Sequence, residues 1–195
     1  MKIRGVLFDM DGTIVDVPYN WPRIKADLGT QGVPILSYLN GLAEPEKSGK
    51  WKILQRYEEE ATRRAVIKRG MRGFLDFLAE RRIKTALITN NSRKNTDVLL
   101  GRFRLAFDFV MTRDDGLWKP SAAPLVAAMN ELHLRKGECS AVGDSHFDIR
   151  AAEEAGIPHI FILSRDRAKF TAFKTAEIIP SVRALREKIE LLLKK

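Results

Sequence analysis

Residues 3–13 read I-R-G-V-L-F-D-M-D-G-T, and this stretch decides the fold. Its first six residues are mostly apolar and favour extended backbone, so they predict a short buried strand. Two carboxylates, Asp9 and Asp11, stand where this strand ends, and Gly12 permits a sharp exit from it. Ligands of open parallel sheets bind beyond the carboxyl ends of the strands. The two aspartates therefore mark the first place to look for a site.

Four similar apolar stretches follow further along the chain, and helical patterns separate them. The predicted strands cover residues 84–89, 107–111, 140–143 and 159–163. Short, continuously apolar strands that alternate with helices are typical of a parallel sheet covered on both faces. The predicted fold class is therefore α/β, with a parallel sheet between two layers of helices.

Residues 17–70 break this alternation. They contain no strong strand pattern, and repeated prolines and glycines divide their first half into short pieces. One long helix is expected over residues 50–69, with Leu54, Tyr57, Ala61 and Ala65 along one face. We expect a small helical unit inserted after the first strand, between core segments 1–16 and 71–195.

The composition is that of an ordinary globular protein. Hydrophobic residues make up 45% of the 195 residues and charged residues 30%. The single cysteine, Cys139, excludes an intrachain disulfide and a site with several cysteine ligands. No apolar run is long enough for a membrane span, and nothing resembles a signal peptide, so a soluble, cytoplasmic protein is expected. The formal net charge of +9 fits a cationic surface, an anionic substrate or a nucleic-acid partner.

Polar side chains gather at the carboxyl ends of the predicted strands and in the loop after the third. In chain order they are Asp9, Asp11, Thr89, Asn90, Lys119, Asp144 and Asp148. Several carboxylates close together repel one another, and a hard dication such as Mg²⁺ relieves that repulsion. Lys119 can neutralise the remaining charge and hold a phosphate, to which Thr89 offers an uncharged donor.

These residues also predict a reaction. A carboxylate beside a metal stays ionised and can attack phosphorus, which gives Asp9 the role of nucleophile and an aspartyl-phosphate as the intermediate. Asp11 lies two residues on and points to the same side of an extended chain. It can protonate the leaving alkoxide and later deprotonate the attacking water.

Four fragments of the sequence resemble the four motifs of the haloacid dehalogenase superfamily, in order and at similar spacing. They read D-M-D-G-T, I-T-N-N, K-P and G-D-S-H-F-D-I-R-A-A-E-E-A-G-I, and the resemblance covers nearly all of residues 1–165. It implies a Rossmann-like core, Asp9 as nucleophile, Asp11 as general acid and base, and a phosphate bound by Thr89 and Lys119.

The resemblance also implies Mg²⁺ held by the Asp9 and Asp144 carboxylates and the Asp11 carbonyl, with Asp148 supporting the metal shell or binding the metal through water. Asn90 is expected to form hydrogen bonds near the nucleophile and so help to bind the phosphate. Residues 17–70 would form a helical cap that closes over the substrate. The segment 121–124, S-A-A-P, departs from the family pattern and predicts a local change of loop.

Within that superfamily, the residues resemble the phosphoglycolate phosphatase-like group most. Asp11 argues against carbon–halogen cleavage, because the dehalogenases lack this second aspartate. Phosphomutases of the β-phosphoglucomutase type use a histidine near the cap hinge, and residues 17–70 contain no histidine. A phosphatase for a small phosphorylated metabolite is the main hypothesis, as a monomer or homodimer.

A phosphomutase and a non-catalytic phosphate-binding regulatory module remain as alternatives. A nucleic-acid partner is not favoured, because the sequence has no continuous basic stripe with interleaved aromatic residues.

Overall fold

The computed structural model describes residues 2–30 and 32–194, which divide into two compact units. Residues 1–16 and 66–195 form the first unit, called the core unit below. Residues 17–65 form the second, called the helical unit. In the part of the chain that the structure describes, no helix is both long and apolar enough to cross a membrane.

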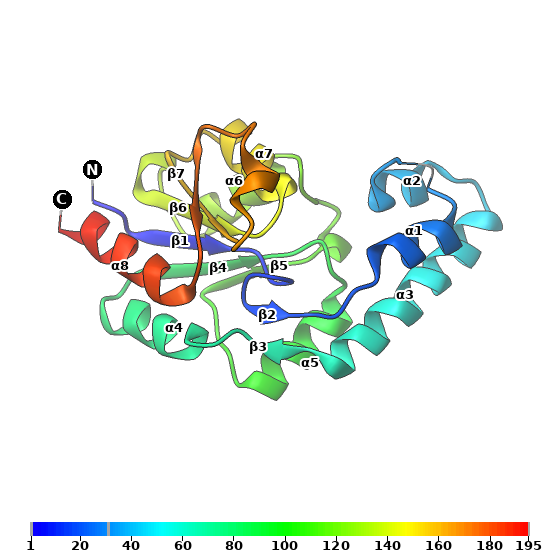
Figure 1. The fold of residues 1–195 in the computed structure, drawn as a ribbon, viewed down its shortest axis with the longest axis horizontal. Helices are drawn as coiled ribbons and strands as arrows, with labels where there is room; N and C mark the ends of the chain where they lie inside the picture. The colour runs from blue at the N-terminus through cyan, green and yellow to red at the C-terminus, as the bar shows by residue number, and fades with distance from the viewer. Residues whose placement is uncertain (1, 31, 195) are drawn as a thin grey trace. The chain divides into compact units, whose positions relative to one another are not determined.

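A six-stranded parallel sheet forms the centre of the core unit (Figure 1). Its strand order is β5-β4-β1-β6-β7-β8, and every neighbouring pair is parallel. The strands are β1 (Gly5–Phe8), β4 (Lys84–Ile88), β5 (Phe109–Met111), β6 (Cys139–Gly143), β7 (His159–Leu163) and β8 (Ala176–Ile179). β1 is central and fully buried, so the carboxylates that follow it lie at the middle of one sheet edge.

Helices cover both faces of this sheet, which confirms the predicted α/β class. On one face lie α6 (Ala123–Glu131) and α7 (His146–Glu154), and on the other α4 (Met71–Glu80) and α8 (Val182–Leu193). Successive side chains of β1 point to opposite faces of the sheet, so they pack against both layers of helices. Leu7 packs in the apolar cluster with Leu125 and Ile149 of the first pair of helices, while Phe8 meets Phe74 of α4 edge-to-face at 6.0 Å.

The predicted sheet was wrong in extent. Five strands were expected, but β8 adds a sixth at an edge of the sheet. Of its residues, Ile179 is buried, Ala176 and Ile178 are half-buried, and Glu177 is exposed. The glutamate in its short sequence, Ala-Glu-Ile-Ile, obscures the apolar pattern expected of a buried strand. A second, two-stranded sheet pairs β2 (Val15–Asp16) with β3 (Val66–Ile67) in antiparallel fashion.

The helical unit contains α1 (Trp21–Leu28), α2 (Ile35–Gly41) and α3 (Glu46–Arg64). The expected long helix therefore exists, but its predicted bounds of 50–69 were wrong at both ends. It starts directly after Pro45, as prolines commonly precede or open a helix. It ends because Ala65 takes an extended conformation that leads into β3. That this unit serves as a cap stays a prediction.

Candidate active site at the carboxyl edge of the sheet

Two glycines allow the carboxylates of the core unit to approach one another. Gly12 has φ +83°, and a Cβ atom built there would overlap the carboxylate of Asp144. A Cβ atom at Gly143, the last residue of β6, would overlap the side chain of Asp148 in the same way. A side chain at position 12 would displace the Asp144 carboxylate, and one at position 143 would displace that of Asp148. Glycine at both positions therefore leaves room for the two carboxylates at this edge.

The Lys119 ammonium lies between two of these carboxylates. Its Nζ is 2.6 Å from an oxygen of Asp9 and 2.6 Å from an oxygen of Asp148. The three side chains are at most 10% exposed, so water screens their charges little. Burial alone would lower the pKa of Lys119, but the charges of Asp148 and Asp9 hold this pKa above its usual value. Lys119 is therefore a permanently charged, buried cation.

The two partners of Lys119 respond differently to burial. Burial, only partly offset by Lys119 and reinforced by the charge of Asp148, raises the pKa of Asp9 to about 6. Burial also acts to raise the pKa of Asp148, but Lys119 and hydrogen bonds from Ser145 outweigh it and hold this pKa below its ordinary value. Ser145 donates to Asp148 from both its backbone N–H (3.0 Å) and its hydroxyl (2.6 Å). Asp148 is thus the more firmly ionised of the pair.

Asp144 adds a third carboxyl group to the two that share the Lys119 ammonium. Burial first, and then the charges of Asp9 and Asp148, raise the pKa of Asp144 to about 8. Ligand oxygens of Asp9, Asp144 and Asp148 lie within 4.8 Å of one another. A cluster of hard oxygen donors with excess negative charge fits a dication such as Mg²⁺. The residues present are therefore suited to the metal that the family resemblance implies.

Thr89 and Asn90 follow β4, the strand that pairs with β1 in the sheet, so they lie at the same sheet edge as Asp9. The hydroxyl oxygen of Thr89, which is 2% exposed, accepts the N–H of Asn91 at 3.0 Å and keeps its own proton as a donor. The Asn90 amide donates to the Lys119 carbonyl (2.8 Å) and accepts the Lys119 N–H (2.9 Å). Asn90 therefore fixes the backbone of the residue whose ammonium bridges Asp9 and Asp148.

Asn91 makes a contact that the sequence did not predict. Its Nδ2 donates to Oδ2 of Asp11 at 3.0 Å and so joins the loop after β4 to the loop after β1. The sequence signal was weak: Asn91 belongs to the quoted I-T-N-N motif, but an adjacent asparagine, Asn90, has the same chemistry. Among the described residues, the carboxylate of Asp11 is not part of the three-carboxylate cluster. The structure thus pairs Asp11 with an amide.

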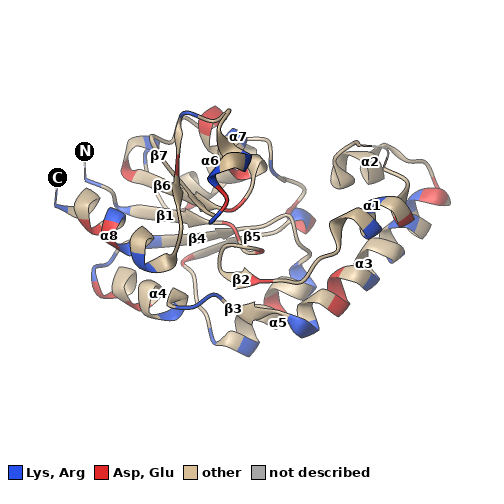
Figure 2. Cartoon of the chain, in the orientation of Figure 1, with Lys and Arg blue, Asp and Glu red and all other residues tan. Residues whose placement is uncertain are grey.

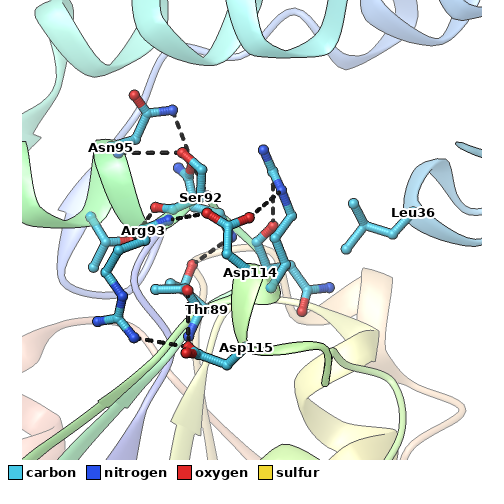
Figure 3. A network of polar contacts seen from close by, with 12 residues as sticks. Leu36, Thr89, Ser92, Arg93, Asn95, Asp114 and Asp115 are labelled. Carbon is cyan, nitrogen blue, oxygen red and sulfur yellow. Dashed lines mark hydrogen bonds and ion pairs between the residues drawn. The ribbon is translucent and has the colours of Figure 1, made fainter. Parts of the chain in front are cut away.

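A second layer of polar contacts holds the loops after β4 and β5 together (Figure 3). The Arg93 guanidinium forms an ion pair with Asp115 at 2.8 Å, and the Arg93 N–H donates to Asp114 at 2.8 Å. The Asp115 carboxylate also accepts the N–H of Thr112 (2.7 Å), and Arg113 donates to the Asn90 carbonyl (3.1 Å). These contacts fix the loop that carries Thr89 and Asn90.

Comparison with known proteins identifies the family. The family model described as haloacid dehalogenase-like hydrolase matches residues 18–162 of this chain. The chain belongs to this family. The matched range includes Thr89, Lys119, Asp144 and Asp148, while Asp9 and Asp11 precede it. The predicted resemblance and the predicted enzyme class, a phosphoric monoester hydrolase of this family, are confirmed.

Similar proteins agree with this assignment. A haloacid dehalogenase-like hydrolase domain-containing protein of Arabidopsis thaliana is 29% identical over 170 residues, which cover 80% of this chain and 69% of that protein. A phosphoglycolate phosphatase of Chromobacterium violaceum is 29% identical over 189 residues, 82% of this chain and 85% of that protein. Among solved structures, a hydrolase from Pseudomonas syringae has a TM-score of 0.80 at 17% identity and covers 96% of this chain and 98% of its own. That last likeness concerns the fold.

Proposed function

We propose that this chain is a magnesium-dependent phosphatase that hydrolyses a small phosphomonoester through an aspartyl-phosphate on Asp9. The observation that carries the proposal is the buried Lys119 ammonium, 2.6 Å from both Asp9 and Asp148, with the Asp144 carboxylate in the same cluster. This arrangement joins a nucleophile, a fixed cation and oxygen ligands at one sheet edge. The likeness to a phosphoglycolate phosphatase supports a small organic phosphate as the substrate.

In the proposed site, Asp9, Asp144 and the Asp11 carbonyl would hold the metal, and Asp148 would support it. A bound Mg²⁺ supplies positive charge that neutralises these carboxylates and polarises a phosphate oxygen. The Lys119 ammonium has three donors, of which Asp9 and Asp148 use two, and the third can bind a phosphate oxygen. The Thr89 hydroxyl proton provides an uncharged donor to the same group.

The first half of the proposed reaction forms the covalent intermediate. A carboxylate oxygen of Asp9 attacks phosphorus, and a new P–O bond forms as the bond to the leaving alkoxide breaks. Asp11 gives its proton to that alkoxide, which departs as an alcohol. Lys119 and Thr89 hold the phosphoryl oxygens while this transfer occurs.

The second half regenerates the enzyme. Asp11, now ionised, takes a proton from a water molecule as the water oxygen attacks phosphorus. The bond between phosphorus and the Asp9 oxygen breaks, and inorganic phosphate leaves. Asp9 is again a carboxylate and Asp11 again an acid, so a single pair of aspartates completes both steps.

We also propose that the predicted cap, residues 17–70, selects the substrate. Its basic side chains would attract an acidic group elsewhere on the phosphorylated substrate. The residues in question are Arg23, Lys25, Lys50, Lys52 and Arg56. A phosphomutase has no specific observation in its favour, because the helical unit contains no histidine.

The decisive experiment measures release of phosphate from p-nitrophenyl phosphate and from a panel of phosphorylated metabolites, with Mg²⁺ and with EDTA. Asp9→Asn is expected to lower turnover by at least about 1,000-fold, because the nucleophile is lost. Its circular dichroism spectrum is expected to stay that of the wild type. Asp97→Asn, an exposed position on α5 (Arg93–Phe103), is the matched control and should retain activity.

Two outcomes would contradict the proposal. Wild-type protein that releases no phosphate from any ester in Mg²⁺ would exclude a phosphatase. Conversion of a sugar phosphate into its isomer, without free phosphate, would identify a phosphomutase instead.

A further inference from the structure

Asn91 connects Asp11 to the first turn of α5 through a short chain of buried amides. Asn91 is 3% exposed and Asn95 is 2% exposed. Asn91 Nδ2 donates to Asp11 Oδ2 at 3.0 Å, while its Oδ1 accepts the Ser92 N–H at 2.8 Å and Asn95 Nδ2 at 3.2 Å. The pair Asn91 and Asp11 is separated by 80 residues in the chain. A side chain of the loop after β4 therefore holds a side chain of the loop after β1.

The orientation of the Asn91 amide is determined by its neighbours. The backbone N–H of Ser92 can only donate, so the group that faces it must be the Asn91 oxygen. Asn95 donates to the same oxygen and strengthens that choice. The NH₂ group of Asn91 must then face Asp11. A carboxylate on Asp11 can accept this hydrogen bond, and the bond fixes rotation of its carboxyl group.

Asn95 is itself held by the helix that it begins. Its N–H donates to the hydroxyl of Ser92, the N-cap of α5, at 3.3 Å. Capping of this kind satisfies a backbone N–H of the first helical turn and stabilises this end of the helix. Figure 3 shows Asn95 beside Ser92 at this end of α5. A chain of hydrogen bonds thus connects the capped end of α5, through the amides of Asn95 and Asn91, to the Asp11 carboxyl group.

We propose that Asn91 is a positioning residue that orients the Asp11 carboxyl group for proton transfer, with Asn95 holding Asn91 in place. This inference rests on the proposed function, in which Asp11 protonates the leaving alkoxide. Orientation matters most when the leaving group needs that proton. A p-nitrophenolate leaves readily without protonation, whereas an alkoxide does not.

The test compares two substrates in each variant by kcat/KM, which reports the steps up to release of the first product. The substrates are p-nitrophenyl phosphate and the best alkyl phosphomonoester of the wild type. Asn91→Ala is expected to lower kcat/KM about 10- to 100-fold for the alkyl ester, within the range of general acid catalysis, and less than about threefold for the nitrophenyl ester. Asn95→Ala should also lower kcat/KM more for the alkyl ester than for the nitrophenyl ester, but by only about threefold.

Two further variants separate positioning from structure. Thr96→Val removes a buried hydrogen bond of the same helical turn, from the Thr96 hydroxyl to the Ser92 carbonyl (2.8 Å), and should leave the ratio of the two substrates unchanged. Asp11→Ala should lower kcat/KM far more for the alkyl ester than for the nitrophenyl ester. Adding Asn91→Ala to it should lower kcat/KM little further, because both residues act through the Asp11 carboxyl group.

The outcomes are distinct. Equal losses on both substrates in Asn91→Ala would make Asn91 merely structural and overturn the inference. If that variant does not fold, Asn95→Ala decides by the same ratio. Wild-type protein that hydrolyses neither ester with Mg²⁺ defeats the proposed function itself, whereas an active wild type with unbiased variants defeats only the role of Asn91.

Discussion

The core unit and the helical unit use their charged residues in different ways. At the carboxyl edge of the core sheet, Asp9, Lys119 and Asp148 are at most 10% exposed, and each has a defined partner. In the helical unit, groups of basic residues and groups of glutamates follow one another along α3 (Figure 2). Several of its basic residues are exposed: Arg23, Lys25, Lys52 and Arg56. Buried charges need partners and so define chemistry, whereas exposed charges are solvated and define little.

The difference explains why the reaction is easier to infer than the substrate. Burying a carboxylate costs free energy, because the charge loses its hydration. A buried cluster of carboxylates is therefore compatible with few functions. An exposed lysine on a helix is compatible with many functions or with none. The same substitution should therefore have a large effect in the core unit and a small one in the helical unit.

The largest contrast is expected for Lys119→Met. The change removes a phosphate donor and leaves Asp9 and Asp148 without their shared cation. We expect kcat/KM to fall by at least about 100-fold, as for loss of a group that stabilises charge in the transition state. We also expect a lower melting temperature, because removing one partner of a buried ion pair costs on the order of 3 kcal/mol.

Lys52→Met is the matched control in the helical unit. Lys52 is exposed on α3, so kcat and the melting temperature should change little. KM for an acidic substrate should rise, because Lys52 is one of the basic residues proposed to attract it. A loss of kcat in Lys52→Met as large as that in Lys119→Met would contradict the division between the two units.

The sequence predicted the buried parts of the core unit better than its edge and its individual polar contacts. The buried strands were found because their apolar runs are continuous, and β8 was missed because Glu177 interrupts an edge strand. Lys119 pairs with the carboxylates of Asp9 and Asp148, and its role in binding phosphate stays a prediction. The contact of Asn91 with Asp11 could not be predicted, because two adjacent asparagines have equal chemistry and only the fold distinguishes them.

Without metal, the stability of the protein is expected to depend on pH through its buried carboxyl groups. Burial and neighbouring carboxylates raise the pKa of Asp144 to about 8, and burial raises that of Asp9 to about 6. Both groups titrate near pH 4 in the unfolded chain, so between about pH 4 and pH 8 the folded state binds more protons. The free energy of unfolding should therefore decrease as pH rises through this range. Asp148, with its lowered pKa, acts in the opposite sense only below about pH 4.

The measurement is the melting temperature in EDTA from about pH 5 to pH 8. We expect a decrease of several degrees in the wild type and a smaller decrease in Asp144→Asn, above all beyond pH 6, where Asp144 is the main titrating carboxyl group. Added Mg²⁺ at pH 8 should restore the wild type more than Asp144→Asn. Asp97→Asn should keep the wild-type slope, and a melting temperature that rises with pH in EDTA would contradict the charge balance described above.

The smallest difference in kcat/KM between the two units is expected when one asparagine side chain is truncated in each. Asn90 in the core unit makes two hydrogen bonds to the Lys119 backbone, and Asn40 in the helical unit donates one to the Leu36 carbonyl at 2.9 Å. Asn90→Ala should lower kcat/KM about 10-fold, since a net contribution of about 1 kcal/mol per hydrogen bond is enough to let Lys119 shift. Asn40→Ala should leave kcat/KM within about twofold, because exposed helix positions tolerate alanine. Equal effects in the two variants would mean that the precision of the carboxyl edge does not depend on its amide contacts, and that the buried charges alone position the reacting groups.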